Sequence, residues 1–299
     1  MKNQYVGDIG DYGKYGLLRH FAKQGVKIGI NWYLTENDES RDGRFISYLK
    51  KTTERYYDPE LFDALKKIAF IPDKSVVMVE EADLIPDALY YHEPLNTSSV
   101  PAGSRKINRR LWHNNARLLL RDAELVFLDP DNGMIGKKNV RSKDSEKYVL
   151  PSEVADYYNA GQNVVYYCHR GRRNQEAWEK VKLEMKEHLR DARIVVLTYH
   201  RGTQRSYIFV IHPDDCDRYL TILAAFDRTF WRDLFMREAV DGVILGRENM
   251  NSPFEVRLDD GSTLVITEKA NGTIWVTSSR KQNVSMMFTP EQLAAYFQL

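Results

Sequence analysis

The chain has 299 residues and carries 43 Lys and Arg against 42 Asp and Glu, so its formal net charge is +1. This balance excludes a uniformly basic coat, and any surface that binds nucleic acid must therefore be a local patch. Two cysteines, Cys168 and Cys216, exclude a disulfide framework, and no apolar run approaches the roughly 20 residues of a membrane span, so we expect a cytoplasmic protein without a membrane partner.

Apolar runs alternate with helical patterns through the first 240 residues. Strand-like runs cover residues 26–34, 76–79, 125–128, 163–168 and 194–199, with a shorter one at 88–91. Helical patterns cover residues 14–24, 59–69, 108–120, 151–160 and 175–189. Most of the strand-like runs are continuously apolar, as buried parallel strands are. The alternation predicts an α/β fold with a mainly parallel sheet and helices on both faces.

The last two apolar runs of this region are joined by only six residues, 200–205. A parallel connection needs about a dozen residues or more, so residues 194–199 and 206–211 are predicted to form an antiparallel hairpin at the end of the sheet. A doubly wound sheet that closes in this way is typical of class I methyltransferase folds, although other α/β folds also carry antiparallel edges. We therefore expect a Rossmann-like methyltransferase-fold domain over residues 1–240.

From residue 241 the sequence changes to short runs separated by tight turns. Runs at residues 254–258, 263–267 and 273–277 predict a β-meander, and Thr289, Pro290 and Glu291 predict the start of a final helix. We expect residues 241–299 to form a separate small module. This module is a candidate surface for a protein partner or for self-association.

Polar turns that contain glycine follow three of the predicted strands. They read Asp-Pro-Asp-Asn-Gly at residues 129–133, His-Arg-Gly-Arg-Arg at 169–173 and His-Arg-Gly at 200–202. In an open α/β sheet, ligands bind beyond the carboxyl ends of the strands. The three turns are therefore predicted to meet at one site.

Two of these turns, at residues 129–133 and 169–173, offer groups with a chemical role. Asp129 directly follows a buried strand, where its carboxylate can accept a hydrogen bond from a substrate or hold a metal ion together with Asp131. His169 is a candidate acid or base. The candidate phosphate-binding residues, whose guanidinium groups offer paired donors, are Arg170, Arg172, Arg173 and Arg109. The same residue types also suit ordinary turns and a solvated helix entry, which is the structural alternative.

Candidate cofactor-binding residues lie at the start of the chain and after the run at 76–79. Gly7, Asp11 and Lys14 precede or begin the first predicted helix, where an anion or a cofactor carboxylate could bind, although Asp11 could equally be only the helix cap. Glu80 or Glu81 is a candidate acceptor for ribose hydroxyl groups.

These residues resemble those of the adenine-N6 methyltransferases of large-subunit ribosomal RNA, a Rossmann-like family that uses S-adenosylmethionine. The family has a glycine, an aspartate and a lysine before its first helix, an Asp-Pro-Pro-Tyr catalytic loop and a closing hairpin. The matching positions are Gly7, Asp11, Lys14, Asp129, Pro130, Arg201, Gly202, Ile211, His212 and Pro213. The similarity covers roughly residues 3–235. The chain also resembles uncharacterised bacterial proteins with an Asp-Pro-Asp-Asn-Gly loop, which imply no activity.

Two features depart from the family pattern. Asp131 and Asn132 replace the second proline and the tyrosine of the loop, and only Gly43 remains where a glycine-rich cofactor loop should follow the first strand. The resemblance implies a methyltransferase acting on nucleic acid or a nucleotide, with Asp129 holding the reacting group and Lys14 near the cofactor. Two alternatives remain: a nuclease or phosphodiesterase with Mg²⁺ or Mn²⁺ at Asp129 and Asp131, and a non-catalytic nucleotide sensor. We expect Asp129→Asn to remove activity and to leave thermal stability nearly unchanged.

Overall fold

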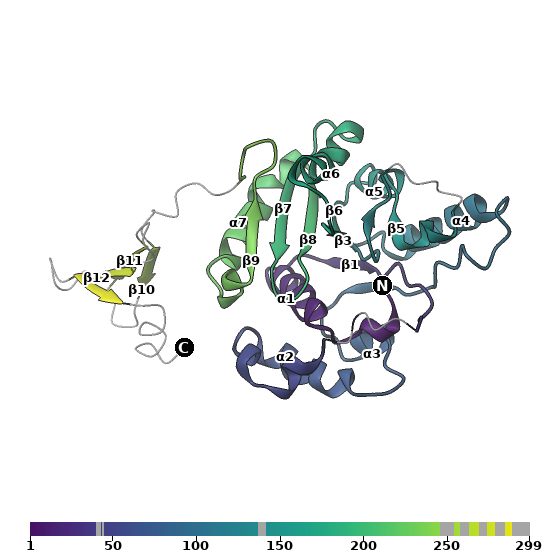
Figure 1. Cartoon of the computed structure of the whole chain (residues 1–299). Helices are drawn as coiled ribbons and strands as arrows, with labels where there is room; N and C mark the ends of the chain where they lie inside the picture. The colour runs from purple at the N-terminus through teal and green to yellow at the C-terminus, as the bar shows by residue number, and fades with distance from the viewer. Residues whose placement is uncertain are drawn as a thin grey trace. The chain divides into compact units, whose positions relative to one another are not determined.

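The computed structural model describes residues 1–39, 43, 45–136 and 142–245, together with the backbone of four strands nearer the C-terminus. The chain divides into two compact units, Met1–Gly246 and Arg247–Leu299. The first unit is built of helices and strands, and the second contains a small sheet (Figure 1). The division expected from the sequence falls at residue 240, and the independent folding of the two parts stays a prediction.

A seven-stranded sheet in the order β2-β1-β3-β6-β8-β7-β9 forms the centre of the first unit. The pairs β2–β1, β1–β3 and β3–β6 are parallel, whereas β8 is antiparallel to both β6 and β7, and β9 is antiparallel to β7. This mixed sheet is compatible with a Rossmann-like fold. Its strands are β1 Ile28–Asn31, β2 Leu89–Tyr91, β3 Leu125–Leu128, β6 Asn163–His169, β7 Arg193–Tyr199, β8 Arg205–Ile211 and β9 Phe235–Glu238.

The predicted antiparallel hairpin at residues 194–211 is confirmed. Strands β7 and β8 pair in register from Arg193 opposite Ile211 to Tyr199 opposite Arg205. The hairpin does not form the edge of the sheet, because β9 pairs with the outer side of β7. Sequence reasoning missed β9, a run of four residues in which Arg237 and Glu238 conceal the apolar pattern of a strand.

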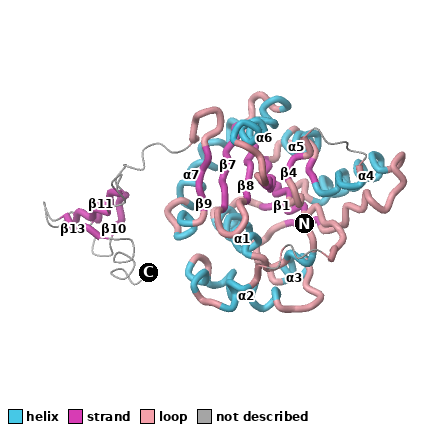
Figure 2. The backbone as a smooth tube through the Cα atoms, in the orientation of Figure 1, coloured by secondary structure: helices cyan, strands magenta, loops and turns pink. Residues whose placement is uncertain are grey.

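Successive strand residues point to opposite faces of the sheet, and here both sets are apolar. Helices therefore cover both faces. On β3, Leu125 and Phe127 belong to one apolar core, and Val126 and Leu128 belong to the other. The first core is covered by α1 Ile9–Lys23, α2 Pro59–Ala69, α3 Val76–Glu81 and α7 Cys216–Phe226. The second core is covered by α4 Arg105–Leu119, α5 Pro151–Tyr158 and α6 Gln175–His188. Figure 2 shows these helices in cyan around the magenta strands.

Short elements complete the first unit. Strands β4 Gly133–Met134 and β5 Tyr148–Val149 form a two-stranded parallel sheet just after β3. The 3₁₀ helices are Asn3–Tyr5, Ser47–Lys50, Thr53–Tyr56, Lys143–Lys147, Pro213–Asp215 and Phe230–Asp233. No helix among the described residues combines the length and the apolar character that a bilayer crossing requires.

The prediction of a strand at residues 76–79 is wrong. The run lies in helix α3, which begins after Ser75 in an extended conformation. Val76 and Val79 are buried, and a spacing of three places them on the same side of a helix. A run of four apolar residues fits a strand or a helix equally well, so periodicity alone could not decide. The strand next to β1 is instead β2, at the shorter run near residue 89.

The first helix begins five residues earlier than predicted. Asp8 is its N-cap residue and accepts a hydrogen bond of 2.7 Å from the amide of Gly10. Gly10 and Gly13 therefore lie inside α1 rather than before it, in a series with Gly16 that repeats every three residues. At each of them an added Cβ would overlap a side chain of another element: Gly10 with Arg205 at 2.2 Å, Gly13 with Tyr199 at 2.6 Å and Gly16 with Trp231 at 2.3 Å. These glycines allow close packing of α1.

The second unit contains four antiparallel strands in sequential order. They are β10 Phe254–Arg257, β11 Thr263–Glu268, β12 Ile274–Ser278 and β13 Ser285–Phe288. The three strands predicted from the sequence are present, and β13 adds a fourth. The helix predicted from residue 289 lies outside the described residues.

Candidate functional site

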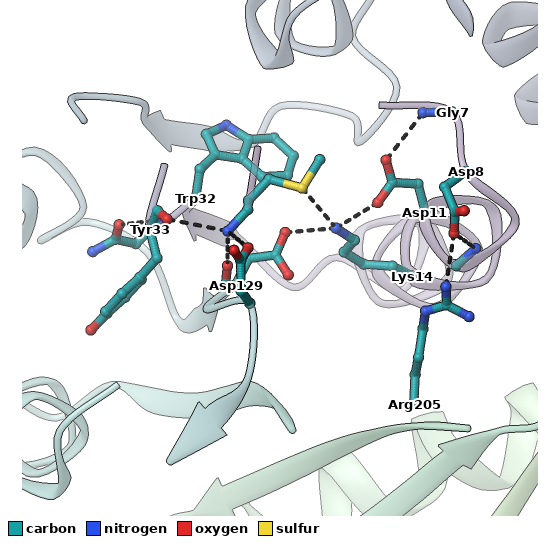
Figure 3. A network of polar contacts seen from close by, with 12 residues as sticks. Gly7, Asp8, Asp11, Lys14, Trp32, Tyr33, Asp129 and Arg205 are labelled. Carbon is teal, nitrogen blue, oxygen red and sulfur yellow. Dashed lines mark hydrogen bonds and ion pairs between the residues drawn. The ribbon is translucent and has the colours of Figure 1, made fainter. Parts of the chain in front are cut away.

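The side chain of Lys14 lies between two carboxylates at the carboxyl end of β3. Its Nζ lies 2.6 Å from Oδ2 of Asp129 and 2.7 Å from Oδ1 of Asp11 (Figure 3). Each of the three side chains is only 6% exposed. The structure therefore brings together three residues that the sequence singled out, but it buries them.

Burial and charge act in opposite directions on this group. Burial lowers the pKa of Lys14, but the carboxylates of Asp11 and Asp129 outweigh it and raise that pKa above its ordinary value. Burial raises the pKa of Asp129 and of Asp11, and the ammonium group of Lys14 offsets part of this increase. Because two buried carboxylates share one lysine, removal of Lys14 would leave two like charges in the interior.

The α-ammonium group of Met1 lies on the other side of Asp129. It is 2.7 Å from Oδ1 of Asp131 and donates hydrogen bonds to the carbonyl oxygens of Asp129 at 2.9 Å and Tyr33 at 3.2 Å. Tyr33 follows β1 and Asp129 follows β3. Since β2 pairs with one side of β1 and β3 with the other, this ammonium group lies at the switch point of the sheet, where open α/β sheets bind ligands.

Aromatic residues, rather than glycines, follow β1. Trp32 and Tyr33 are fully buried, and Tyr33 has a φ of 45°, a left-handed conformation that is uncommon for residues with a side chain. The hydroxyl group of Tyr33 donates to Glu153 at 2.9 Å. Backbone strain of this kind occurs preferentially at functional sites, and here it coincides with the switch point.

Glu80 is not the residue after a strand that the sequence indicated, because it lies on helix α3. One of its carboxylate oxygens accepts a 2.7 Å hydrogen bond from Nε1 of Trp32, and the other lies 2.9 Å from Nδ1 of His92. The acid that does follow β2 is Glu93, two residues after the strand, and it is exposed. Sequence reasoning missed Glu93 because it placed the second strand at residues 76–79.

Gly7 and Asp8 organise the start of α1. Gly7 has a φ of 81°, its amide donates to Oδ2 of Asp11 at 3.1 Å, and an added Cβ would lie 2.5 Å from Cβ of Ala69. Oδ1 of Asp8 pairs with Nη2 of Arg205 at 2.9 Å (Figure 3). The amide of Gly7 is thus engaged within the fold, and local packing accounts for the glycine.

His169 ends β6, the strand beside β3, and lies opposite Arg205 of β8 in the sheet register. The hydroxyl group of Tyr167 lies 3.5 Å from Nδ1 of His169. Nη1 of Arg173 donates to the carbonyl oxygens of His169 at 2.7 Å and of Arg170 at 3.0 Å. Burial, followed by the charges of Arg205 and Arg173, lowers the pKa of His169 below its ordinary value. Burial and the neighbouring guanidinium groups therefore favour the neutral form of this imidazole.

The other two arginines of this turn lie further out. Nη2 of Arg170 donates to Oε1 of Gln175 at 2.7 Å, and its guanidinium lies 6.0 Å from the ring centre of Trp178. Arg172 is exposed. Both belong to the turn after β6, which pairs in parallel with β3, the strand that Asp129 follows.

Arg109 lies in a buried polar network with Glu153, which also accepts a hydrogen bond from Tyr33. It is 2% exposed, and Nε and Nη2 pair with the carboxylate of Glu153 at 2.6 and 2.8 Å. Its remaining donors bind the carbonyl oxygens of Ser145 at 2.7 Å and Tyr148 at 2.6 Å. These four hydrogen bonds use four of the five N–H donors of the guanidinium and tie α4 to α5 and β5, so the paired donors of Arg109 are not available to a phosphate.

The described residues contain no group of three His, Cys, Asp or Glu side chains that could hold a metal ion. Asp129 and Asp131, the proposed ligands, each face an ammonium group instead, that of Lys14 and that of Met1 respectively.

Comparison with known proteins shows no family for this chain. No family model matches it, and no curated protein matches it in sequence. Among solved structures, it is similar to the crystal structure of protein LPL1258 from Legionella pneumophila str. Philadelphia 1, described with the family model DUF519. The TM-score is 0.40 and the identity 10%, over 79% of this chain and 97% of that chain. A likeness at this level carries no argument about function.

Proposed function

We propose that residues 1–246 form a methyltransferase-like unit that binds S-adenosylmethionine and acts on nucleic acid or a nucleotide. The observation that carries the proposal is the set of acceptors around an ammonium group at the switch point of the sheet. Two carbonyl oxygens, from Tyr33 and Asp129, and the carboxylate of Asp131 gather there. An amino acid with a free α-ammonium group requires acceptors of this kind.

The topology of the sheet supports the same proposal. Strand β8 lies between β6 and β7 and is antiparallel to its neighbour β6. The four strands β2, β1, β3 and β6 are parallel to one another. A closing hairpin of this type is typical of class I methyltransferase folds. Because one fold hosts many functions, the topology supports the proposal without establishing the activity.

The residues present fit the amino-acid end of S-adenosylmethionine and supply one candidate for its ribose. The acceptors at Tyr33, Asp129 and Asp131 fit its ammonium group, and Glu93 offers an exposed carboxylate after β2. The cofactor and the α-ammonium group of Met1 compete for the same acceptors, so binding requires Met1 to move. When bound, the cofactor supplies an electrophilic methyl group.

Asp129 is the proposed anchor of the group that receives the methyl. Lys14 holds Oδ2, and within the described part of the chain no donor contacts Oδ1. This oxygen is available to accept a hydrogen bond from an amino group and to orient it. Lys14 balances part of the charge of the carboxylate, and Asp11 fixes the position of Lys14.

The phosphodiesterase alternative has less support, since ammonium groups face both of its metal ligands. A titration separates the possibilities. Isothermal titration calorimetry on the full chain measures the affinity for S-adenosylmethionine, for S-adenosylhomocysteine and for 5′-methylthioadenosine. The last of these lacks the amino-acid end. Separate titrations measure the affinity for Mg²⁺ and for Mn²⁺. We expect the first two to bind and methylthioadenosine to bind at least about tenfold more weakly, because it leaves the charged acceptors unused. Equal affinity for all three ligands, or binding of none, would overturn the proposal.

Catalysis is tested by the transfer of labelled methyl groups to nucleic acid and nucleotides. Asp129→Asn should keep cofactor affinity and lose transfer. Asp122→Asn is the matched control, because Asp122 is 65% exposed and remote from the strand end. A wild type that binds the cofactor without transferring the methyl group would favour the sensor alternative.

A further inference from the structure

We propose that His169, Arg173 and Arg205 form a binding site for a phosphate group, placed to hold the phosphate of a nucleotide whose base lies toward Asp129. The phosphate chemistry stands on its own geometry. Only the identity of the molecule that carries the phosphate rests on the proposed function.

The three residues lie together at one end of the β6–β8 strand pair. His169 and Arg205 are directly opposite each other on β6 and β8, so their side chains leave the same face of the sheet as neighbours. The guanidinium group of Arg173 lies next to the backbone of His169, because its Nη1 donates a hydrogen bond to the carbonyl oxygen of that residue. Three positively charged or protonatable groups thus meet beside the strand that carries Asp129.

The surroundings of His169 carry more positive than negative charge. The turn at residues 169–173 contains three arginines and no acid. Within the described residues, Asp8 forms an ion pair with Arg205, and the carboxylate of Glu184 on α6 interacts electrostatically with Arg173. Arg173 uses Nη1 for the backbone, and no described residue accepts a hydrogen bond from its Nε or Nη2. A doubly charged anion bound between these side chains would be attracted to each of them and would offset the repulsion among their positive charges.

The two ring nitrogens of His169 have different surroundings. Tyr167 contacts Nδ1 of His169, so Nε2 is the nitrogen left for a ligand. Gly171 has a φ of 59°, and an added Cβ there would lie 4.0 Å from Nε2. The absence of a side chain at residue 171 keeps that edge of the imidazole open. Burial and the two arginines keep the pKa of His169 low without a ligand, and a bound dianion is expected to raise it.

The test uses inorganic sulfate and phosphate on the full chain, with no cofactor present. Sulfate stays doubly charged across the pH range, so any change in its affinity reports protonation of the protein. We expect the imidazole resonance of His169, assigned by its loss in His169→Gln, to titrate at higher pH when sulfate is bound. By linkage, sulfate then binds more tightly as the pH falls from 8 to 5.5. Adenosine monophosphate should bind more tightly than phosphate, and adenosine without phosphate should not compete with sulfate.

Two variants define the site. Arg173→Gln should weaken sulfate binding about tenfold, as expected for the loss of charged hydrogen bonds. Arg190→Gln, an exposed arginine beyond α6, should leave sulfate affinity unchanged. His169→Gln should keep residual binding but remove its dependence on pH. The proposal would be overturned if Arg173→Gln and Arg190→Gln changed the affinity for sulfate equally. It would also be overturned if the titration of the His169 resonance were the same with and without sulfate. Sulfate binding without binding of S-adenosylmethionine would leave the phosphate site standing and reject the proposed function.

Discussion

The ammonium group of Lys14 and the carboxylate of Asp129 form an ion pair of 2.6 Å, although the two residues are 115 positions apart in the sequence. The pair joins the first turns of α1 to the carboxyl end of β3. Because it is almost fully buried, its two members contribute to the stability of the fold as well as to the candidate site.

Lys14→Met should be strongly destabilising. The variant leaves the carboxylates of Asp11 and Asp129 buried without their shared cation, which costs about 3–5 kcal/mol of unfolding free energy at pH 7. Denaturant unfolding followed by circular dichroism measures this loss. Lys23→Met, on the same helix with a side chain 53% exposed, is the control and should change stability by less than about 0.5 kcal/mol.

The destabilisation of Lys14→Met should depend on pH. Without Lys14, burial keeps the pKa of Asp11 and Asp129 above that of the unfolded chain, so the folded state binds more protons between the two values. Stability of the variant therefore falls as the pH rises above the unfolded pKa of about 4. We expect the deficit relative to wild type to shrink between pH 7 and pH 4.5, and a constant deficit would contradict the buried location of the carboxylates.

The burial of Asp129 also changes the expectation for Asp129→Asn. A carboxylate that is 6% exposed and paired with Lys14 supports the fold, so its loss should cost about 2 kcal/mol rather than leave stability unchanged. Thermal and denaturant unfolding of this variant beside Asp122→Asn measures the difference. A melting temperature identical to that of wild type would show that the pair contributes nothing.

Gly13→Ala should destabilise the protein although alanine favours helices. The helix propensity gain of about 1 kcal/mol is outweighed by overlap of the new Cβ with the ring of Tyr199 at 2.6 Å, which costs about 1–3 kcal/mol. Gly103→Ala is the matched control, since no atom lies within 4 Å of an added Cβ there. Increased stability of Gly13→Ala in denaturant unfolding would mean that α1 does not pack this closely against β7.

Arg109→Met should lower the free energy of unfolding by about 3–5 kcal/mol, because it leaves the buried carboxylate of Glu153 without its ion-pair partner. Arg172→Met, at an exposed position of the 169–173 turn, should stay within about 0.5 kcal/mol of wild type. Denaturant unfolding compares the two. Comparable stability of both variants would argue against a structural role for Arg109.

The end of the first unit can be located by truncation. Leu245 packs against the first core, and its carbonyl oxygen accepts a hydrogen bond of 3.2 Å from Nη1 of Arg237. A chain ending at residue 246 should therefore keep the melting temperature of the α/β unit. A chain ending at residue 240 should melt several degrees lower, as expected for a loss of about 1–2 kcal/mol in a domain of this size. Equal melting of the two would place the boundary at residue 240.

The sequence by itself determined the α/β alternation and the hairpin, because both depend on local features. Continuous apolar runs indicate strands where both faces of the sheet are covered, as on β3. Six residues between residues 199 and 206 are too few for a parallel connection, so this pair had to be antiparallel. The helices at α2, α4, α5 and α6 followed from their periodicity for the same reason. Residues 76–79 show the limit, since a run of four apolar residues has no period that separates a helix from a strand.

Only the tertiary structure decided what the candidate site residues do. Arg109 and Arg173 are both arginines beside polar segments, yet Arg109 is enclosed by Glu153 and backbone carbonyl groups, whereas Arg173 contacts backbone carbonyl oxygens through Nη1 alone among the described residues. Lys14, Asp11 and Asp129 were identified from the chain, but their burial in one ion-pair group was not. Burial and charge pairing depend on which elements the fold packs together, and this is long-range information that the pattern of a local segment does not contain.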